Sequence, residues 1–246
     1  MATKGTAKNI IVGAAQLFVA DENLEYFTVA DGAATAGVYF PSSISGSADV
    51  TLPSAAASAS YADTLETTGS NANYIATGKT IRNVGYTMNG LELQFQPDFG
   101  EVTVDQILDV ARMYKQGMQV NLATAFAEST LENLVVAIAA KNEDYTESGS
   151  FTAALTVTAG DIGDVPVERA LIAVGPGSGD PTLVANSRKE RVYTAYRALS
   201  IENVTVNAKR DEPSMFEVSF RLLPAGNGVY GKIVDRVYTQ SGNLVN

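Results

Sequence analysis

Hydrophobic and polar residues alternate in several short stretches of the chain, and each alternation predicts a strand with one buried face. The clearest cases are 91–96 and 216–222, where Leu, Val and Phe alternate with Glu, Gln, Ser and Arg. The segment 119–126 places its larger apolar side chains on every second position in the same way. These patterns predict a mainly β chain.

One stretch has helical spacing instead. Ser129 is a suitable helix cap, and Glu132 three residues later completes a capping box. Lys141 near the expected end suits the helix dipole. A helix of this length is marginal alone, so we expect it to lie against a sheet. Its predicted apolar face consists of Leu131, Leu134, Val135 and Ile138.

Weaker patterns predict further strands and the turns between them. Turns are expected at Asn89-Gly90 and at 115–117, and Pro97 is expected to end a strand. The segment 101–114 is ambiguous, because Thr103 with Gln106 could open a short helix. A charged loop is expected at 142–150, and a β-hairpin at 201–223. The other expected strands are 8–19, 26–29, 80–84, 151–157, 167–174, 191–198 and 229–238.

The region from about 40 to 78 differs in kind from the rest. It is dense in Ala, Ser, Thr, Gly and Asn, and its large apolar residues are too sparse to build a core. One interpretation is a flexible surface loop, and the other is an extended arm that binds a partner. Aromatic side chains on such an arm could equally pack back onto the parent domain. The predicted subunit-interface residues of the arm are Tyr61, Leu65, Tyr74 and Ile75.

Composition narrows the possible chemistry. The chain has 246 residues, enough for a sizeable core, and it contains no Cys and no His. An enzyme would therefore have to use carboxylates, Lys, Ser or Tyr, and the commonest metal ligand is absent. No apolar run reaches membrane-spanning length, and no signal peptide is expected. We predict no catalytic residues, no cofactor, no metal site and no membrane partner.

Individual motifs do not change this expectation. The glycines at 175–179 follow a predicted strand, but their spacing is wrong for a dinucleotide loop. Gly78-Lys79-Thr80 lacks the upstream glycine of a phosphate-binding loop. Asn203 begins a glycosylation triplet that we interpret as chance, inside a strand. The acidic pairs Asp161/Asp164 and Asp21/Glu22 could bind calcium, but they lack a ligand-loop pattern.

Charge is negative and uneven along the chain. Seventeen basic and 27 acidic residues give a net charge of −10, which argues against a surface that grips nucleic acid. No Lys or Arg occurs between Lys8 and Lys79, whereas 188–221 holds seven basic and five acidic residues. The two regions could simply be solvated faces. They could also form a head-to-tail contact between copies, because unlike charges steer association.

The order of several weak motifs resembles a known family. The run Val84-Gly85-Tyr86-Thr87-Met88-Asn89-Gly90 is followed by Val104-Asp105-Gln106 and then by Ala127-Glu128-Ser129-Thr130-Leu131-Glu132-Asn133-Leu134. The strand containing Glu168-Arg169-Ala170-Leu171 and the expected hairpin at 201–223 come in the same order. Together they resemble the tail tube proteins, or major tail proteins, of long-tailed bacteriophages, over most of residues 80–235.

The resemblance implies a single domain over 1–246, a β-sandwich or partly closed β-barrel flanked by one helix, with the long polar arm as an insertion. It implies a structural virion protein of the phage tail, made in the host cytoplasm. Such subunits form stacked, typically hexameric rings through which genomic DNA passes without specific binding. The implied partners are further copies, the tape measure protein and the tail terminator.

Two alternatives stay open at this point. One is a decoration protein or adhesin that binds a capsid or a receptor without forming tubes. The other is a carboxylate-based enzyme acting on carbohydrates, which the absence of Trp disfavours because sugar clefts commonly use aromatic platforms.

Overall fold

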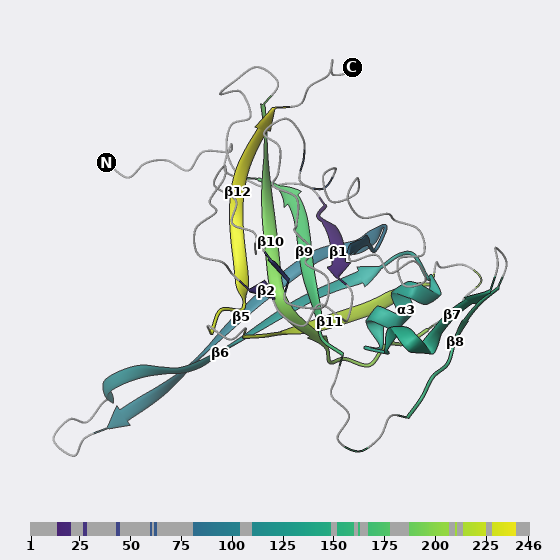
Figure 1. The fold of residues 1–246 in the computed structure, drawn as a ribbon. Coiled ribbons are helices and arrows are strands. Elements are labelled where there is room, and N and C mark those ends of the chain that lie inside the picture. Colours follow the sequence, from purple (N-terminus) through teal and green to yellow (C-terminus); the bar gives the residue numbers. More distant parts are fainter. Residues whose placement is uncertain are drawn as a thin grey trace.

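The described part of the protein is built mainly of antiparallel strands, as the alternating patterns predict, together with helix α3 (Figure 1). The computed structural model describes residues 14–20, 27–28, 43–44, 60, 62, 81–103, 110–148, 152–159, 162, 167–177, 187–206, 210, 214–224 and 228–239. Within these residues, the largest sheet has eight strands in the order β4-β1-β9-β10-β11-β6-β5, and β12 also pairs with β10. Two smaller sheets pair β2 with β3 and β7 with β8.

The strands have the following bounds: β1 Gln16–Ala20, β2 Phe27–Thr28, β3 Ser43–Ile44, β4 Ile81–Asn83, β5 Thr87–Thr103, β6 Val110–Phe126, β7 Tyr145–Ser148, β8 Thr152–Leu155, β9 Arg169–Pro176, β10 Ser187–Ser200, β11 Phe216–Leu223 and β12 Gly231–Thr239. The helix α3 spans Leu131–Ala137, and a 3₁₀ turn, η2, spans Asn142–Asp144.

Strand β10 joins two halves of the large sheet. Its residues 187–195 pair with β12, whereas its last residues, 197–200, pair with β11. Its pairing with β9 shifts register between Ala195 and Ala198. A strand that changes partners at such an irregularity forms the corner of an orthogonal sandwich. Accordingly β12, β10, β9 and β1 stand upright in Figure 1, and β11, β6 and β5 cross them at a steep angle.

The hydrophobic core lies between these two halves. Leu17, Leu171 and Ala195 come from the upright half and are at most 3% exposed. Phe126 and Phe220 come from the crossing half, with ring centroids 6.4 Å apart. The predicted mainly β fold with a flanking helix is therefore confirmed for the described residues, and the two halves of the sheet form a sandwich.

The helix exists, but its predicted start is wrong by one residue and its predicted face is only half right, because Val135 is buried and Leu134 packs against the core. The cap is Thr130, whose hydroxyl accepts a hydrogen bond from the Asn133 amide at 3.2 Å. The expected cap, Ser129, instead donates to the Ser214 carbonyl. Leu131 and Ile138 of the predicted face are both 37% exposed. The buried residues are Asn133, Val135, Val136 and Ala137.

Hydrogen bonds explain this rotation of the helix. The fully buried Asn133 side-chain amide donates to the Val84 carbonyl at 2.9 Å and to the Glu128 carbonyl at 2.8 Å. Asn133, a polar residue, thus faces inward. The spacing of apolar residues alone cannot predict this orientation. The helix ends at Ala137, before Lys141, and Ala139 is left-handed with a φ of 53°.

Three predicted breaks in β5 and β6 are wrong. Asn89 and Gly90 have left-handed φ values of 63° and 74°, but they form a bulge inside β5 and do not end it. Pro97 lies within β5 opposite Met118, which is possible because β5 is an edge strand and Pro lacks only a hydrogen-bond donor. Residues 115–117 continue β6, with a register shift in place of a turn.

Two further segments differ from prediction. Residues 201–206 are not a strand, so the described part of the predicted first arm of the hairpin at 201–223, including Asn203, lies outside the sheet. The strand that pairs with β11 is the end of β10. The expected charged loop at 142–150 contains η2 and β7, and β7 pairs with β8. Within the ambiguous segment 101–114, residues 101–103 and 110–114 are strand.

The remaining predicted strands are present with shifted ends. Segments 119–126 and 216–222 are confirmed within β6 and β11, and Val120, Leu122 and Phe126 are buried as the alternation requires. The described parts of the weaker segments coincide with β1, β2, β4, β8, β9, β10 and β12.

Candidate assembly interface

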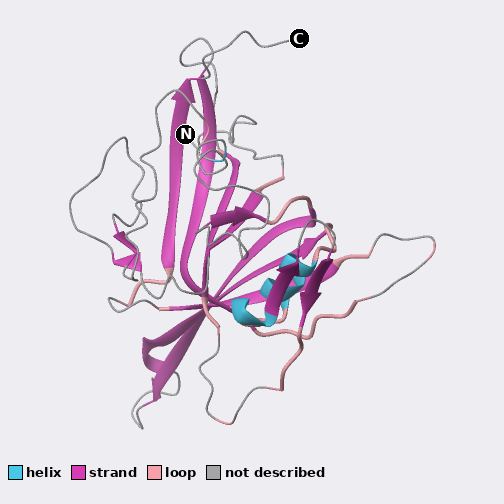
Figure 2. Ribbon diagram, turned by 45° about the vertical axis from the view of Figure 1, so that its right-hand side comes forward, coloured by secondary structure: helices cyan, strands magenta, loops and turns pink. Residues whose placement is uncertain are grey.

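A long two-stranded ribbon extends from the large sheet. Strands β5 and β6 are each 17 residues long and pair along their length from Thr87 opposite Phe126 to Thr103 opposite Val110. Only the root of this ribbon lies in the sheet, beside β11. Its far half projects away from the body of the molecule (Figures 1 and 2).

The two faces of the ribbon differ in chemistry. Along one face, side chains from β5, β6 and β11 form a polar face, and it carries three carboxylates against one guanidinium by the register of the strands. The β5 residues of this face are all exposed. The polar face consists of Glu92, Gln94, Gln96, Asp98, Gln119, Asn121, Glu217 and Arg221.

The opposite face of the ribbon is mainly apolar, although Glu101 and Lys115 share it. At the root, Leu93 and Leu122 face the core. Toward the far end an apolar stripe continues, although Phe95, Phe99 and Met113 are 51–56% exposed. The stripe consists of Phe95, Pro97, Phe99, Met113 and Met118.

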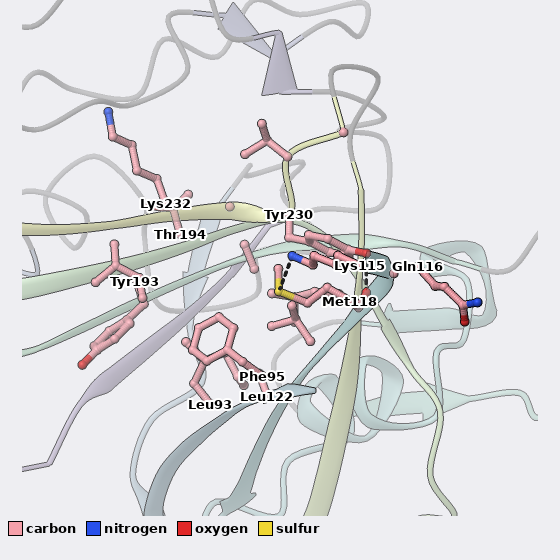
Figure 3. Close-up of a pocket in the computed structure, with 18 residues that line it drawn as sticks. Leu93, Phe95, Lys115, Gln116, Met118, Leu122, Tyr193, Thr194, Tyr230 and Lys232 are labelled. Atoms are coloured by element: carbon pink, nitrogen blue, oxygen red, sulfur yellow. Dashed lines mark hydrogen bonds between the residues drawn. The ribbon is translucent and has the colours of Figure 1, made fainter. Parts of the chain in front are cut away.

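Where the stripe begins, the sandwich is open. A cavity of about 590 Å³ lies between the ribbon root and the strands β10 and β12. A second hollow of about 400 Å³ shares Leu93, Phe95, Tyr193 and Ile233 with it, so the two form one opening, which we call the mouth. In Figure 3 the rings of Phe95 and Tyr193 border the cavity, and the Tyr230 hydroxyl donates to the Met118 carbonyl.

Charged groups surround this apolar opening. Lys115 reaches into it, with its ammonium 3.7 Å from the Met118 sulfur. Beyond Tyr193 on the same face of β10, Arg191 forms a two-pronged ion pair with Asp235, whose second contact is 2.7 Å. Hydrogen bonds from Arg191, aided by the charge of Lys189, lower the pKa of the Asp235 carboxyl. The mouth side of β10 and β12 is thus slightly positive.

The root of the ribbon is tied to the start of the helix. Gly85 has a left-handed φ of 83°, and a Cβ on it would lie 2.2 Å from Cδ of Glu128. The backbone amide of Tyr86 donates to the Glu128 carboxylate at 3.0 Å. Together with the Asn133 contacts, these bonds join four residues: Val84, Tyr86, Glu128 and Asn133. They position the ribbon relative to the helix.

A buried ionic group lies behind this junction. Arg82 is 4% exposed, and its guanidinium lies 3.6 Å from the Glu132 carboxylate, whose side chain is 12% exposed. Burial outweighs the attraction of Arg82 and raises the pKa of Glu132, and the charge of Glu147 adds to this rise. The group joins β4, α3 and β7.

None of the residues predicted to form an interface can be placed. Tyr61, Leu65, Tyr74 and Ile75 lie outside the described residues, as do the two acidic pairs and Gly78-Lys79-Thr80. Gly175 belongs to β9, and the Gly177 amide bonds the Lys189 carbonyl, so these two residues extend the sheet beside β10.

Sequence reasoning missed the ribbon, although two signals were present. Apolar residues continue beyond Pro97 at Phe99 and Val102, and again at Met113 and Tyr114. An edge strand tolerates Pro, so Pro97 did not require an end to the alternation. Tyr114 lies over Gly100, where a Cβ would approach its ring to 2.7 Å.

Two kinds of site are absent from the described residues. They contain no group of three or more Asp, Glu, His or Cys side chains that could hold a metal ion. They also contain no helix long and apolar enough to cross a membrane. Comparison with known proteins found no matching family model and no matching curated protein.

Proposed function

We propose that this chain is a structural subunit that assembles with copies of itself into the rings of a phage tail tube. The single observation that supports this most strongly is the β5–β6 ribbon. Two-stranded ribbons are at best marginally stable in water, and this one exposes apolar residues far from its own core. A partner that covers the ribbon would remove that cost.

The edges of the sheet support self-association as well. Strand β5 ends the sheet on one side and β4 on the other, and the outer edge of β12 pairs with no described strand. Unpaired edges are a liability unless a neighbour covers them. Contacts between unlike surfaces of identical copies close into rings or continue as filaments. The resemblance to tail tube proteins makes stacked rings the form that we propose.

The polar face suits the wall of a DNA conduit. Its amide and carboxylate side chains carry an excess of negative charge, because Arg221 is outnumbered by Glu92, Asp98 and Glu217. Tight DNA binding uses Lys and Arg to neutralise phosphates, so such a wall would repel DNA and let it pass. In this proposal the polar face lines the channel.

Electron microscopy combined with sedimentation over a concentration series tests the proposal. The wild-type chain should form stacked rings with a central channel. Phe99→Ser combined with Met113→Ser should keep the monomer folded but abolish the rings. Val157→Ser is the matched control, because Val157 is 76% exposed but lies away from the ribbon.

Two results would contradict the proposal. A wild-type chain that stays monomeric at every concentration would favour a decoration protein or an adhesin. Rings that survive both ribbon substitutions would show that the ribbon does not carry assembly.

A further inference from the structure

The mouth is an unfinished part of the hydrophobic core. Its floor is formed by Val120, Leu122 and Leu222, which belong to the core cluster. Its rim is still open to solvent, since Ile233 and Val229 are 48% and 39% exposed. A cavity of about 590 Å³ is far larger than the voids between close-packed side chains, so an apolar group from elsewhere would complete the packing.

The far part of the ribbon does not fill the mouth of its own copy. The residues that line the mouth from β5 are Leu93 and Phe95, and the strand then leads away from the body (Figure 1). At ~3.4 Å per residue, the segment from Pro97 to Thr103 extends roughly 20 Å farther. Phe99 and Met113 line neither hollow, so they do not fill the mouth of their own copy.

The far stripe and the mouth are complementary in charge as well as in hydrophobicity. Glu101 lies opposite Met113 in the ribbon register and shares its face with Phe99. Along β10 the mouth offers Lys189 beside the Arg191–Asp235 pair, whereas Lys115 lies opposite Phe99 on the ribbon itself. A carboxylate that arrives with the apolar stripe would thus meet net positive charge.

We propose that the far ribbon of one copy docks in the mouth of the next, with Phe99 and Met113 against the walls formed by Tyr193 and Ile233. This inference rests on the proposed function and names the surfaces that join the copies. The two surfaces differ, so a copy that docks through its ribbon still offers its own mouth to another copy. Repetition of one such contact generates a ring or a filament.

Cysteine cross-linking of the full chain tests the contact, because the natural sequence has no Cys. Met113→Cys and Ile233→Cys are prepared as separate proteins, mixed under assembly conditions and oxidised. Separate proteins are used because a bond in the mixture can only join two copies. The matched control replaces Ile233→Cys by Val157→Cys, and circular dichroism confirms that each variant is folded.

A disulfide-linked dimer is expected in the first mixture, and none is expected in the control mixture or in either single variant. If the wild type forms tubes but the first mixture links no better than the control, the docking is wrong while the proposed function stands. If neither tubes nor links form, both are wrong. Links without tubes support the docking and contradict the tube.

Native mass spectrometry of the monomer tests the alternative that a small molecule occupies the mouth. A bound apolar small molecule, together with absent cross-links, would overturn the docking and make the mouth a ligand pocket, because its volume is within the usual range for such pockets, ~300–1,000 Å³.

Discussion

Gly85 offers a sharp test of the junction between the ribbon and the helix. Gly85 and Gly90 both have left-handed backbones, with φ values of 83° and 74°. They differ in surroundings: a Cβ at Gly85 would meet the Glu128 carboxylate at 2.2 Å, whereas a Cβ at Gly90 meets nothing within 4 Å. Gly90→Ala is therefore the matched control for Gly85→Ala.

The magnitude follows from the contacts. Placing Ala in a left-handed conformation costs about 1–2 kcal/mol, and restriction of the unfolded chain returns about 0.4–1 kcal/mol, so Gly90→Ala should lose about 1 kcal/mol. Gly85→Ala should also displace Glu128 and break its bond from the Tyr86 amide. A solvent-exposed hydrogen bond is worth about 1 kcal/mol, and the steric displacement adds to this, so the total should be about 2–3 kcal/mol.

The assay is urea unfolding followed by circular dichroism, at concentrations where the chain is monomeric, because association would add apparent stability. A double-mutant cycle with Glu128→Ala isolates the contact: in that background Gly85→Ala should cost no more than Gly90→Ala. The expected coupling is about 1–2 kcal/mol. Equal losses for the two glycine variants in the wild-type background, within about 0.5 kcal/mol, would refute the reasoning.

Three other outcomes are expected. Val135→Asp, at a fully buried site, should cost about 3 kcal/mol or more, whereas Leu131→Asp should change the thermal midpoint little; equal losses would show that the helix is rotated otherwise. The pKa of Glu132 is raised above 4.5 in the folded state, so the free energy of unfolding should fall as pH rises through that folded-state pKa. Glu132→Gln should flatten this pH dependence, measured by urea titration at several pH values. Parallel pH profiles for the variant and the wild type would contradict the prediction. Tubes that carry both Glu92→Lys and Glu217→Lys should retain duplex DNA in a filter assay, and salt should weaken this retention. Wild-type tubes, and control tubes that carry Glu143→Lys on η2, should not retain DNA. Equal retention by all three kinds of tube would count against a polar face that lines the channel.

Local patterns were reliable where one face of a strand is buried. The alternation in 119–126 and 216–222 indicates which side chains are buried, because a strand that shifted its register by one residue would expose its apolar side chains. Val120, Leu122 and Phe220 are accordingly at most 2% exposed.

Predictions failed where the meaning of a residue depends on its neighbours in space. Asn89-Gly90 is a turn signal in a central hairpin, but here a bulge uses the same left-handed conformations within a continuing edge strand. The helix is turned by the two hydrogen bonds of Asn133, and both acceptors lie outside the helix, in other parts of the chain. The candidate interface was missed for a similar reason. Pro97 interrupts a strand only where a neighbouring strand requires a hydrogen bond from the backbone amide at that position.

The sequence by itself determined the mainly β class, the presence of one helix, and a chemistry without thiols or imidazoles, because these depend on composition and on periodicities of two and 3.6 residues. Only the tertiary structure decided that β10 changes partners at a bulge, that β5 and β6 leave the body as a ribbon, and that the sandwich is open at the mouth. These features depend on pairings between residues far apart in the chain, such as β10 with β12 and β11 with β6, which local patterns do not contain.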